Sequence, residues 1–147
     1  MLCASCAKQN QQAATPPSPS PQYNYTHQLQ IGKQTLMVEI STTPAQMQQG
    51  LSGRTSMADD QGMLFDFGPT PASTPFWMKD MNFNLDFVWI AGNKVVGITP
   101  NAPAPLSPTE NLPLYYPPEP VNQVLEVNAG WAKKNNVSVG DGVNLAN

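Results

Sequence analysis

Residues 62–90 read GMLFDFGPTPASTPFWMKDMNFNLDFVWI, and this stretch decides the fold because it holds most of the aromatic side chains. All five Phe and two of the three Trp lie within it. Each ring brings a large apolar surface, so we expect most of them to be buried. Four charged residues interrupt them, Asp66, Lys79, Asp80 and Asp86. Charges beside core aromatic rings must pair, face water or take part in chemistry, so they are the main functional indication.

Length and composition favour one compact domain. The chain has 147 residues, which is enough to bury one core. Only 12% of the residues are charged, the net charge is −3 and no basic run occurs. We therefore expect no nucleic-acid partner. No stretch approaches the ~20 apolar residues of a membrane span.

The first 22 residues differ from the rest of the chain. They are polar and rich in proline, which predicts a disordered tether at 1–22 before a single domain at 23–147. Cys3 and Cys6 are the only cysteines, so no disulfide joins parts of the domain. Their C-x-x-C spacing supplies only half of a zinc site, and no βαβ pattern surrounds it. We therefore predict no metal here.

Ala4-Ser5-Cys6 resembles the small residues that precede the lipid-modified cysteine of bacterial lipoproteins, and Cys6 is the candidate lipidation site. A complete signal needs about 7–15 apolar residues upstream. Only five residues precede Cys6, so either translation starts further upstream or the similarity is accidental. We expect an exported, periplasmic or membrane-anchored lipoprotein that meets the membrane only through this anchor. The alternative is a cytoplasmic protein whose tail carries two free thiols.

Hydrophobic periodicity predicts a mainly β domain. Alternating apolar residues favour a hairpin over 23–40, and Thr43-Pro44 is typical of a helix start. Further strands are predicted at 62–67, 76–78, 85–90, 94–99, 121–127 and 143–145, with a second short helix at 130–135. This count of seven or eight short strands and two short helices predicts a compact β-sandwich or barrel-like fold.

A proline-rich loop connects two of these strands. Residues 100–120 contain eight prolines, and loops of this length in compact domains are often functional. Leu112, Leu114, Tyr115 and Tyr116 could let the segment pack against the domain as a flap.

Common catalytic arrangements are missing from the sequence. His27 is the only histidine, no G-x-S-x-G elbow is present, and no glycine-rich phosphate loop or H-E-x-x-H motif occurs. No cluster of histidine, cysteine and carboxylates has metal-ligand spacing. Met78 and Met81 form an M-x-x-M, which suits Cu(I), but two Met in an aromatic run are more often core residues. We predict neither a metal nor another cofactor.

Two carboxylates lie inside apolar strands, Asp86 and Glu126. Such residues are usually paired or functional. Asp86 alternates with Leu85 and Phe87, which predicts that it points away from an aromatic core face. We expect Arg54, the only arginine, to pair with Asp86 as a structural brace, with Lys79 as the other counter-ion.

The functional interpretation of the same residues is a polar pocket. Asp86 and Glu126 would form its floor, and Trp77 and Met78 its walls. A hydrolase that uses the two carboxylates as a pair is an alternative.

The order of short motifs along residues 29–145 resembles the uncharacterised family called domain of unknown function 192. The motifs are Gly50-Leu51-Ser52-Gly53-Arg54, Gly62-Met63-Leu64-Phe65, Phe76-Trp77-Met78-Lys79, Leu85-Asp86, Val124-Leu125-Glu126-Val127-Asn128-Ala129-Gly130 and Gly140-Asp141. The resemblance implies a compact, mainly β fold, often behind a bacterial signal or lipoprotein anchor, and no accepted activity. This chain departs from the family pattern at Asp80-Met81 and Asn84, where the turn shape can differ.

These observations lead to one hypothesis and two alternatives. The hypothesis is a non-catalytic, monomeric cell-envelope domain that binds a small molecule or an envelope protein. The candidate binding residues are Arg54, Trp77, Met78, Lys79, Asp86 and Glu126. The alternatives are the carboxylate-pair hydrolase and an accessory structural domain without a ligand.

Overall fold

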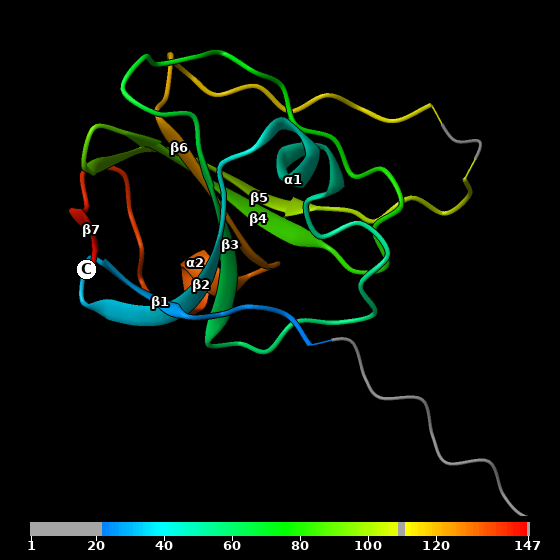
Figure 1. Cartoon of the computed structure of the whole chain (residues 1–147), viewed down its shortest axis with the longest axis horizontal. Coiled ribbons are helices and arrows are strands. Elements are labelled where there is room, and N and C mark those ends of the chain that lie inside the picture. Colours follow the sequence, from blue (N-terminus) through cyan, green and yellow to red (C-terminus); the bar gives the residue numbers. More distant parts are fainter. Residues whose placement is uncertain (1–21, 109–110, 147) are drawn as a thin grey trace, which may run out of the picture.

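The computed structural model describes residues 22–108 and 111–146, and in these residues the chain forms one seven-stranded sheet and two short helices (Figure 1). The strands are β1 (His27–Ile31), β2 (Gln34–Ser41), β3 (Gln61–Asp66), β4 (Leu85–Ala91), β5 (Lys94–Ala102), β6 (Gln123–Asn128) and β7 (Val143–Leu145); the helices are α1 (Pro44–Gln49) and α2 (Trp131–Lys134). The prediction of a mainly β, barrel-like fold is confirmed.

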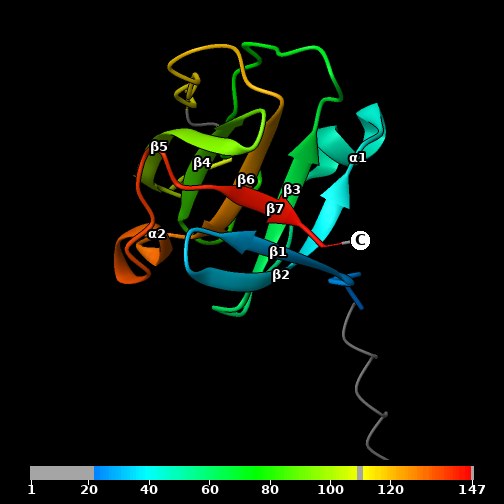
Figure 2. The same cartoon turned by 90° about the vertical axis from the view of Figure 1, so that its left-hand side faces the viewer.

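The sheet is curled into a half-barrel with the strand order β5-β4-β6-β3-β2-β1-β7. Its pairs are antiparallel except β2 with β3, whose parallel pairing requires the crossover that contains α1. The two ends of the order approach each other (Figure 2): Lys94 forms a bridge with Gly142, and the Val95 amide donates to the Asp141 carbonyl at 3.0 Å. The curl therefore leaves little exposed sheet edge at this side.

Both faces of the central strands are buried, and a separate core lies on each. On β4, Val88 and Ile90 belong to the inner core, while Phe87 and Trp89 belong to the outer core. Trp131 and Ala132 of α2 pack into the inner core. Asp86 points away from the aromatic face of β4, and a second core lies on its side of the sheet too.

Irregular segments cover the outer core. The segment predicted as a strand at 76–78 forms no regular strand. Phe76 makes an isolated antiparallel bridge with Tyr115. The Tyr115 ring packs on Phe87 with centroids 5.3 Å apart, which attaches the proline-rich loop to the sheet. Leu114 and Tyr116 remain 49% and 59% exposed, so only part of the predicted flap packs. The loop also starts later than predicted, because β5 continues to Ala102.

Helix α1 begins and ends where local signals place it. Thr43 accepts a hydrogen bond from the Gln46 amide, and the Gln46 side chain accepts from the Thr43 amide, which is a complete capping box. Pro44 occupies the first turn. Gly50 ends the helix at φ 48°, and a Cβ there would lie 3.2 Å from the Phe65 ring. α1 is thus fixed tightly above β3.

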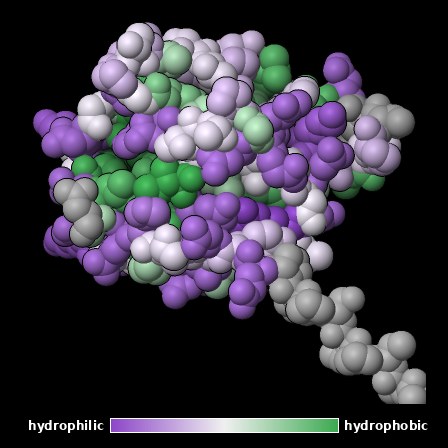
Figure 3. Space-filling model, viewed as in Figure 1, coloured by the Kyte–Doolittle hydropathy of each residue, from purple (hydrophilic) through white to green (hydrophobic). Residues whose placement is uncertain are grey.

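The surface seen in Figure 3 is mostly hydrophilic, and its apolar residues gather in a band bordered by hydrophilic ones. In the described residues no helix has the length and apolar character needed to cross a membrane. Cys3, Cys6 and nearly all of the predicted tether lie outside the described residues.

Candidate functional site

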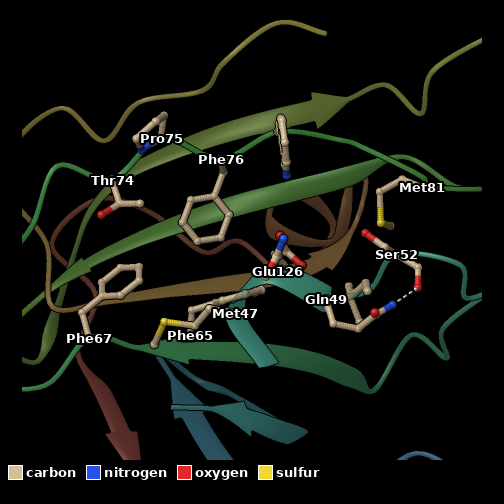
Figure 4. Close-up of a pocket in the computed structure, with 14 residues that line it drawn as sticks. Met47, Gln49, Ser52, Phe65, Phe67, Thr74, Pro75, Phe76, Met81 and Glu126 are labelled. Atoms are coloured by element: carbon tan, nitrogen blue, oxygen red, sulfur yellow. Dashed lines mark hydrogen bonds between the residues drawn. The ribbon is translucent and has the colours of Figure 1, made fainter. Parts of the chain in front are cut away.

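A cavity of about 210 Å³ opens on the outer face of the sheet, beside α1 (Figure 4). Its walls come from α1 and the turn after it, from residues 74–77, and from strands β3 and β6. Most of the apolar side chains in its lining are aromatic rings and thioethers: Met47, Phe65, Phe67, Phe76, Trp77 and Met81. The cavity therefore suits an apolar ligand.

Edge-to-face contacts hold the aromatic wall. The Phe65 and Phe76 centroids are 4.9 Å apart with an interplanar angle of 86°, and Phe67 meets Phe76 edge-on at 6.3 Å. Trp77 is 50% exposed, and the Lys79 ammonium lies 5.5 Å from its ring centroid. The packed rings form a preformed wall, while Trp77 presents apolar surface to solvent beside it.

Glu126 supplies the one ionisable side chain among the lining residues. It projects from β6 between the aromatic side of the cavity and the side formed by Ser52 and Met81 (Figure 4). Burial raises the pKa of its carboxyl from 4.5 to about 8, and the positive charge of Arg54 opposes this increase only in part. Within residues 22–108 and 111–146 the carboxyl has no hydrogen-bond partner. At neutral pH it is therefore mostly protonated and has a free donor.

Hydrogen bonds to the backbone fix the polar side of the cavity. The Gln49 side chain donates to the Ser52 carbonyl at 3.0 Å, and the Ser52 hydroxyl donates to the Lys79 carbonyl at 2.8 Å. The second bond ties the turn after α1 to the segment that carries Trp77. These bonds keep the opening in one shape.

Arg54 does not pair with Asp86, and the predicted brace is wrong. Its guanidinium makes an ion pair with Glu39 on β2 at 2.8 Å and donates to the Tyr25 hydroxyl at 2.8 Å. It also lies 3.8 Å from the Tyr23 ring centroid. Arg54 thus ties the segment before β1 to β2.

Asp86 instead binds backbone amides. One carboxylate oxygen accepts from the Asn101 and Gly130 amides at 2.8 and 3.0 Å, and the other accepts from Ala132 at 3.1 Å. These bonds join β4 to the end of β5 and to the start of α2. The residue is structural, and its three donors satisfy the buried carboxylate.

Asp86 and Glu126 lie on opposite faces of the sheet. Glu126 is directly opposite Phe87 in the β4–β6 pairing, so it shares the outer face with Phe87. Asp86, one residue earlier, points to the inner side. The shared pocket floor predicted for these carboxylates is wrong, and the pair that the hydrolase hypothesis requires is not formed.

The structure brings only Trp77 and Glu126 of the six predicted binding residues to the cavity. Met78 is buried in the outer core, and so is most of Met81, as expected for core methionines. Lys79 lies next to Trp77, outside the lining. In the described part of the chain, no group of three or more histidine, cysteine or acidic residues could hold a metal ion.

Sequence reasoning missed the aromatic wall and Met47 as site residues. Phe65 follows Met63 on the same face of the strand predicted at 62–67. Residues 63, 65 and 67 lie on the same face of the sheet as residues 124 and 126. The sequence could show this common face only once the pairing of β3 with β6 was known.

Comparison with known proteins agrees with this architecture. Residues 27–145 match the model of the DUF192 family, described as "Uncharacterized ACR". None of the curated proteins matches the chain. The chain resembles a crystal structure from Sinorhizobium meliloti 1021 described as a "putative transcription regulator", with 35% identity and a TM-score of 0.73 over 84% of this chain and 97% of that one.

A second similar structure is a protein of unknown function from Novosphingobium aromaticivorans DSM 12444. It is 27% identical, with a TM-score of 0.70 over 80% of this chain and 83% of that chain. The family match spans nearly the whole described domain, and the predicted family resemblance is confirmed. The chain belongs to the DUF192 family.

Proposed function

We propose that this protein is a non-catalytic domain that binds a small, largely apolar molecule in the cavity beside α1. The single observation that carries the proposal is the aromatic, thioether-lined cavity with one unpartnered carboxyl in its wall. Ligand sites are commonly concave and apolar, with a small number of placed polar groups. A cavity that served only as a packing defect would have no need of a buried carboxyl, whose burial destabilises the fold.

Binding is favoured over hydrolysis because, in the described part of the chain, no second catalytic group lines the cavity with Glu126. The other lining residues are apolar or carry amide and hydroxyl groups, and Asp86 lies across the sheet.

Direct nucleic-acid binding is not favoured either. The net charge is −3, with seven basic residues in the chain. The description of the S. meliloti protein as a regulator therefore adds no DNA-binding role to the proposal.

The test is ligand retrieval from protein purified from its native envelope. Thr74 lines the cavity with an exposed side chain, so Thr74→Trp should fill the opening. Thr70→Trp, on the same loop but outside the lining, is the matched control. We expect mass spectrometry to find a compound that co-purifies with the wild type and Thr70→Trp and is depleted at least about tenfold from Thr74→Trp. Equal amounts in all three proteins would contradict the proposal.

We further propose that the domain works in the cell envelope, held by a lipid on Cys6. The support is the Ala4-Ser5-Cys6 sequence and the polar tether after it. Cys6→Ser should move the protein from the membrane fraction to the soluble fraction, with Cys3→Ser as the control. An unchanged distribution of Cys6→Ser would refute the anchor.

A further inference from the structure

We infer that the ligand is a neutral, mostly apolar molecule with a single oxygen acceptor, such as a ketone, which accepts a hydrogen bond from the Glu126 carboxyl. This inference rests on the proposed function and specifies its ligand class. It follows from three properties of the cavity: one unpartnered donor, apolar walls and the charge around the donor.

The donor is the first property. Glu126 is 5% exposed, and no described residue shares a hydrogen bond with its carboxyl. Among the other polar side chains of the lining, Gln49 and Ser52 already donate to backbone carbonyls, and Gln48 and Thr74 are exposed to solvent. A ligand oxygen near Glu126 would therefore pair with a carboxyl that faces the cavity and has no hydrogen-bond partner among the described residues.

The walls limit the rest of the ligand. Phe65, Phe67 and Phe76 form one side, and the thioethers of Met47 and Met81 add soft, polarisable surface. A ligand with further polar groups would leave them without partners against these side chains. One acceptor and an apolar body thus match the cavity.

The charges favour a neutral ligand over a cation. Arg54 is the charged residue whose field reaches Glu126, and it lowers the pKa of the carboxyl without overcoming burial. The ion pair with Glu39 neutralises Arg54, so its excess field is small. On the facing strands, Met63 of β3 and Phe87 of β4 are the residues opposite Glu126, and neither titrates. An ammonium ligand would first have to displace the carboxyl proton before it could pair with Glu126.

The test compares three probes of nearly the same shape by ¹H–¹⁵N NMR titration of the full chain. Acetophenone carries the acceptor, α-methylstyrene replaces that oxygen by a methylene group, and 1-phenylethylammonium carries a positive charge. At about pH 6 we expect acetophenone to bind roughly five- to tenfold more tightly than α-methylstyrene, the effect of one hydrogen bond. At about pH 9.5, where the carboxyl has ionised, the preference should fall to about one or below.

Two variants separate hydrogen bonding from shape. Glu126→Gln keeps an N–H donor, so the acetophenone preference should persist and become independent of pH. Glu126→Met keeps the length but removes the donor, so both neutral probes should bind with similar dissociation constants. If Glu126→Met fails to fold, the pH series on the wild type and Glu126→Gln decides the question alone.

The outcomes distinguish the two proposals. Equal binding of acetophenone and α-methylstyrene by the wild type at about pH 6 would overturn the acceptor inference while leaving a ligand-binding cavity. Tighter binding of 1-phenylethylammonium would also overturn it, in favour of a cationic ligand. If no probe shifts the amide signals of Gly50, Ser52 and Phe76, both the inference and the proposed function fail.

Discussion

At the scale of single residues, the buried side chains of Asp86 and Arg54 are satisfied by partners that sequence spacing does not reveal. The position of Asp86 inside an apolar strand predicted that it is paired or functional, and it is buried and hydrogen-bonded. The sequence could not indicate the partners. Asp86 binds backbone amides, and every residue type except proline has one, so no particular side chain marks these partners in the sequence. Glu39, the partner of Arg54, lies in a strand where polar and apolar residues alternate, so nothing distinguishes it from its polar neighbours.

A double-mutant cycle tests the assignment of Arg54. Arg54 is almost completely buried and its partner Glu39 is partly buried, so the pair is screened less than a surface pair. We expect a coupling energy of about 1 kcal/mol or more between Arg54→Gln and Glu39→Gln in urea unfolding. The matched cycle of Arg54→Gln with Asp86→Asn should give a coupling near zero. Strong coupling to Asp86 would contradict the arrangement described above.

At the scale of elements, prediction worked where the signal is local. The start of α1 is encoded by Thr43, Pro44 and Gln46, three adjacent or nearly adjacent residues, and its end by Gly50. The segment 76–78 looked like a strand because it is apolar, yet its burial comes from covering the outer core. Tertiary packing of an apolar loop gives the same sequence pattern as a short strand, and periodicity alone does not separate them.

The capping box gives a prediction for α1, which borders the cavity. No α1 residue is fully buried, so the cap contributes a large share of its local stability. Thr43→Ala should cost about 1 kcal/mol. The loss should appear as faster hydrogen exchange at the Met47 and Gly50 amides, which donate to Thr43 and Gln46. Thr42→Ala, an exposed neighbour, is the control, and equal exchange in the two variants would rule out the cap as the stabilising feature.

At the scale of the whole molecule, the sheet separates two cores with different roles. The inner core is sealed by α2 and the curl of the sheet, whereas the outer core is covered by α1 and irregular segments that leave a cavity. Val88 and Ile90 of β4 belong to the inner core and Phe87 and Trp89 to the outer core, but these faces could be assigned only from strand pairing. This is why the sequence predicted a barrel-like fold correctly and placed Asp86 and Glu126 in the same pocket incorrectly.

The protonated Glu126 makes the stability of the whole domain depend on pH. Its carboxyl has a pKa of about 8 when folded and an ordinary value near 4.5 when unfolded. Between these values the folded state holds a proton that the unfolded chain has released, so the free energy of unfolding falls as pH rises. The stabilisation that comes from keeping this carboxyl neutral is complete below about pH 4.5. It is lost progressively up to about pH 8, at roughly 1.4 kcal/mol for each unit between the two pKa values. Above about pH 8 the free energy of unfolding no longer changes through this group.

Glu126→Gln removes this titration while keeping the shape of the side chain. The free energy of unfolding of Glu126→Gln minus that of the wild type should therefore increase by several kcal/mol between about pH 5 and pH 8.5. The reason is that only the wild type loses stability as the pH rises, because its unfolded chain releases the Glu126 proton that the folded state keeps. Urea unfolding at a series of pH values measures the difference, in which the contributions of other groups cancel. Glu119→Gln, at an exposed position, should follow the wild-type curve in parallel. If the difference in free energy of unfolding between Glu126→Gln and the wild type does not change with pH, the Glu126 carboxyl has an ordinary pKa in the folded protein. It would then be ionised at neutral pH, contrary to the prediction.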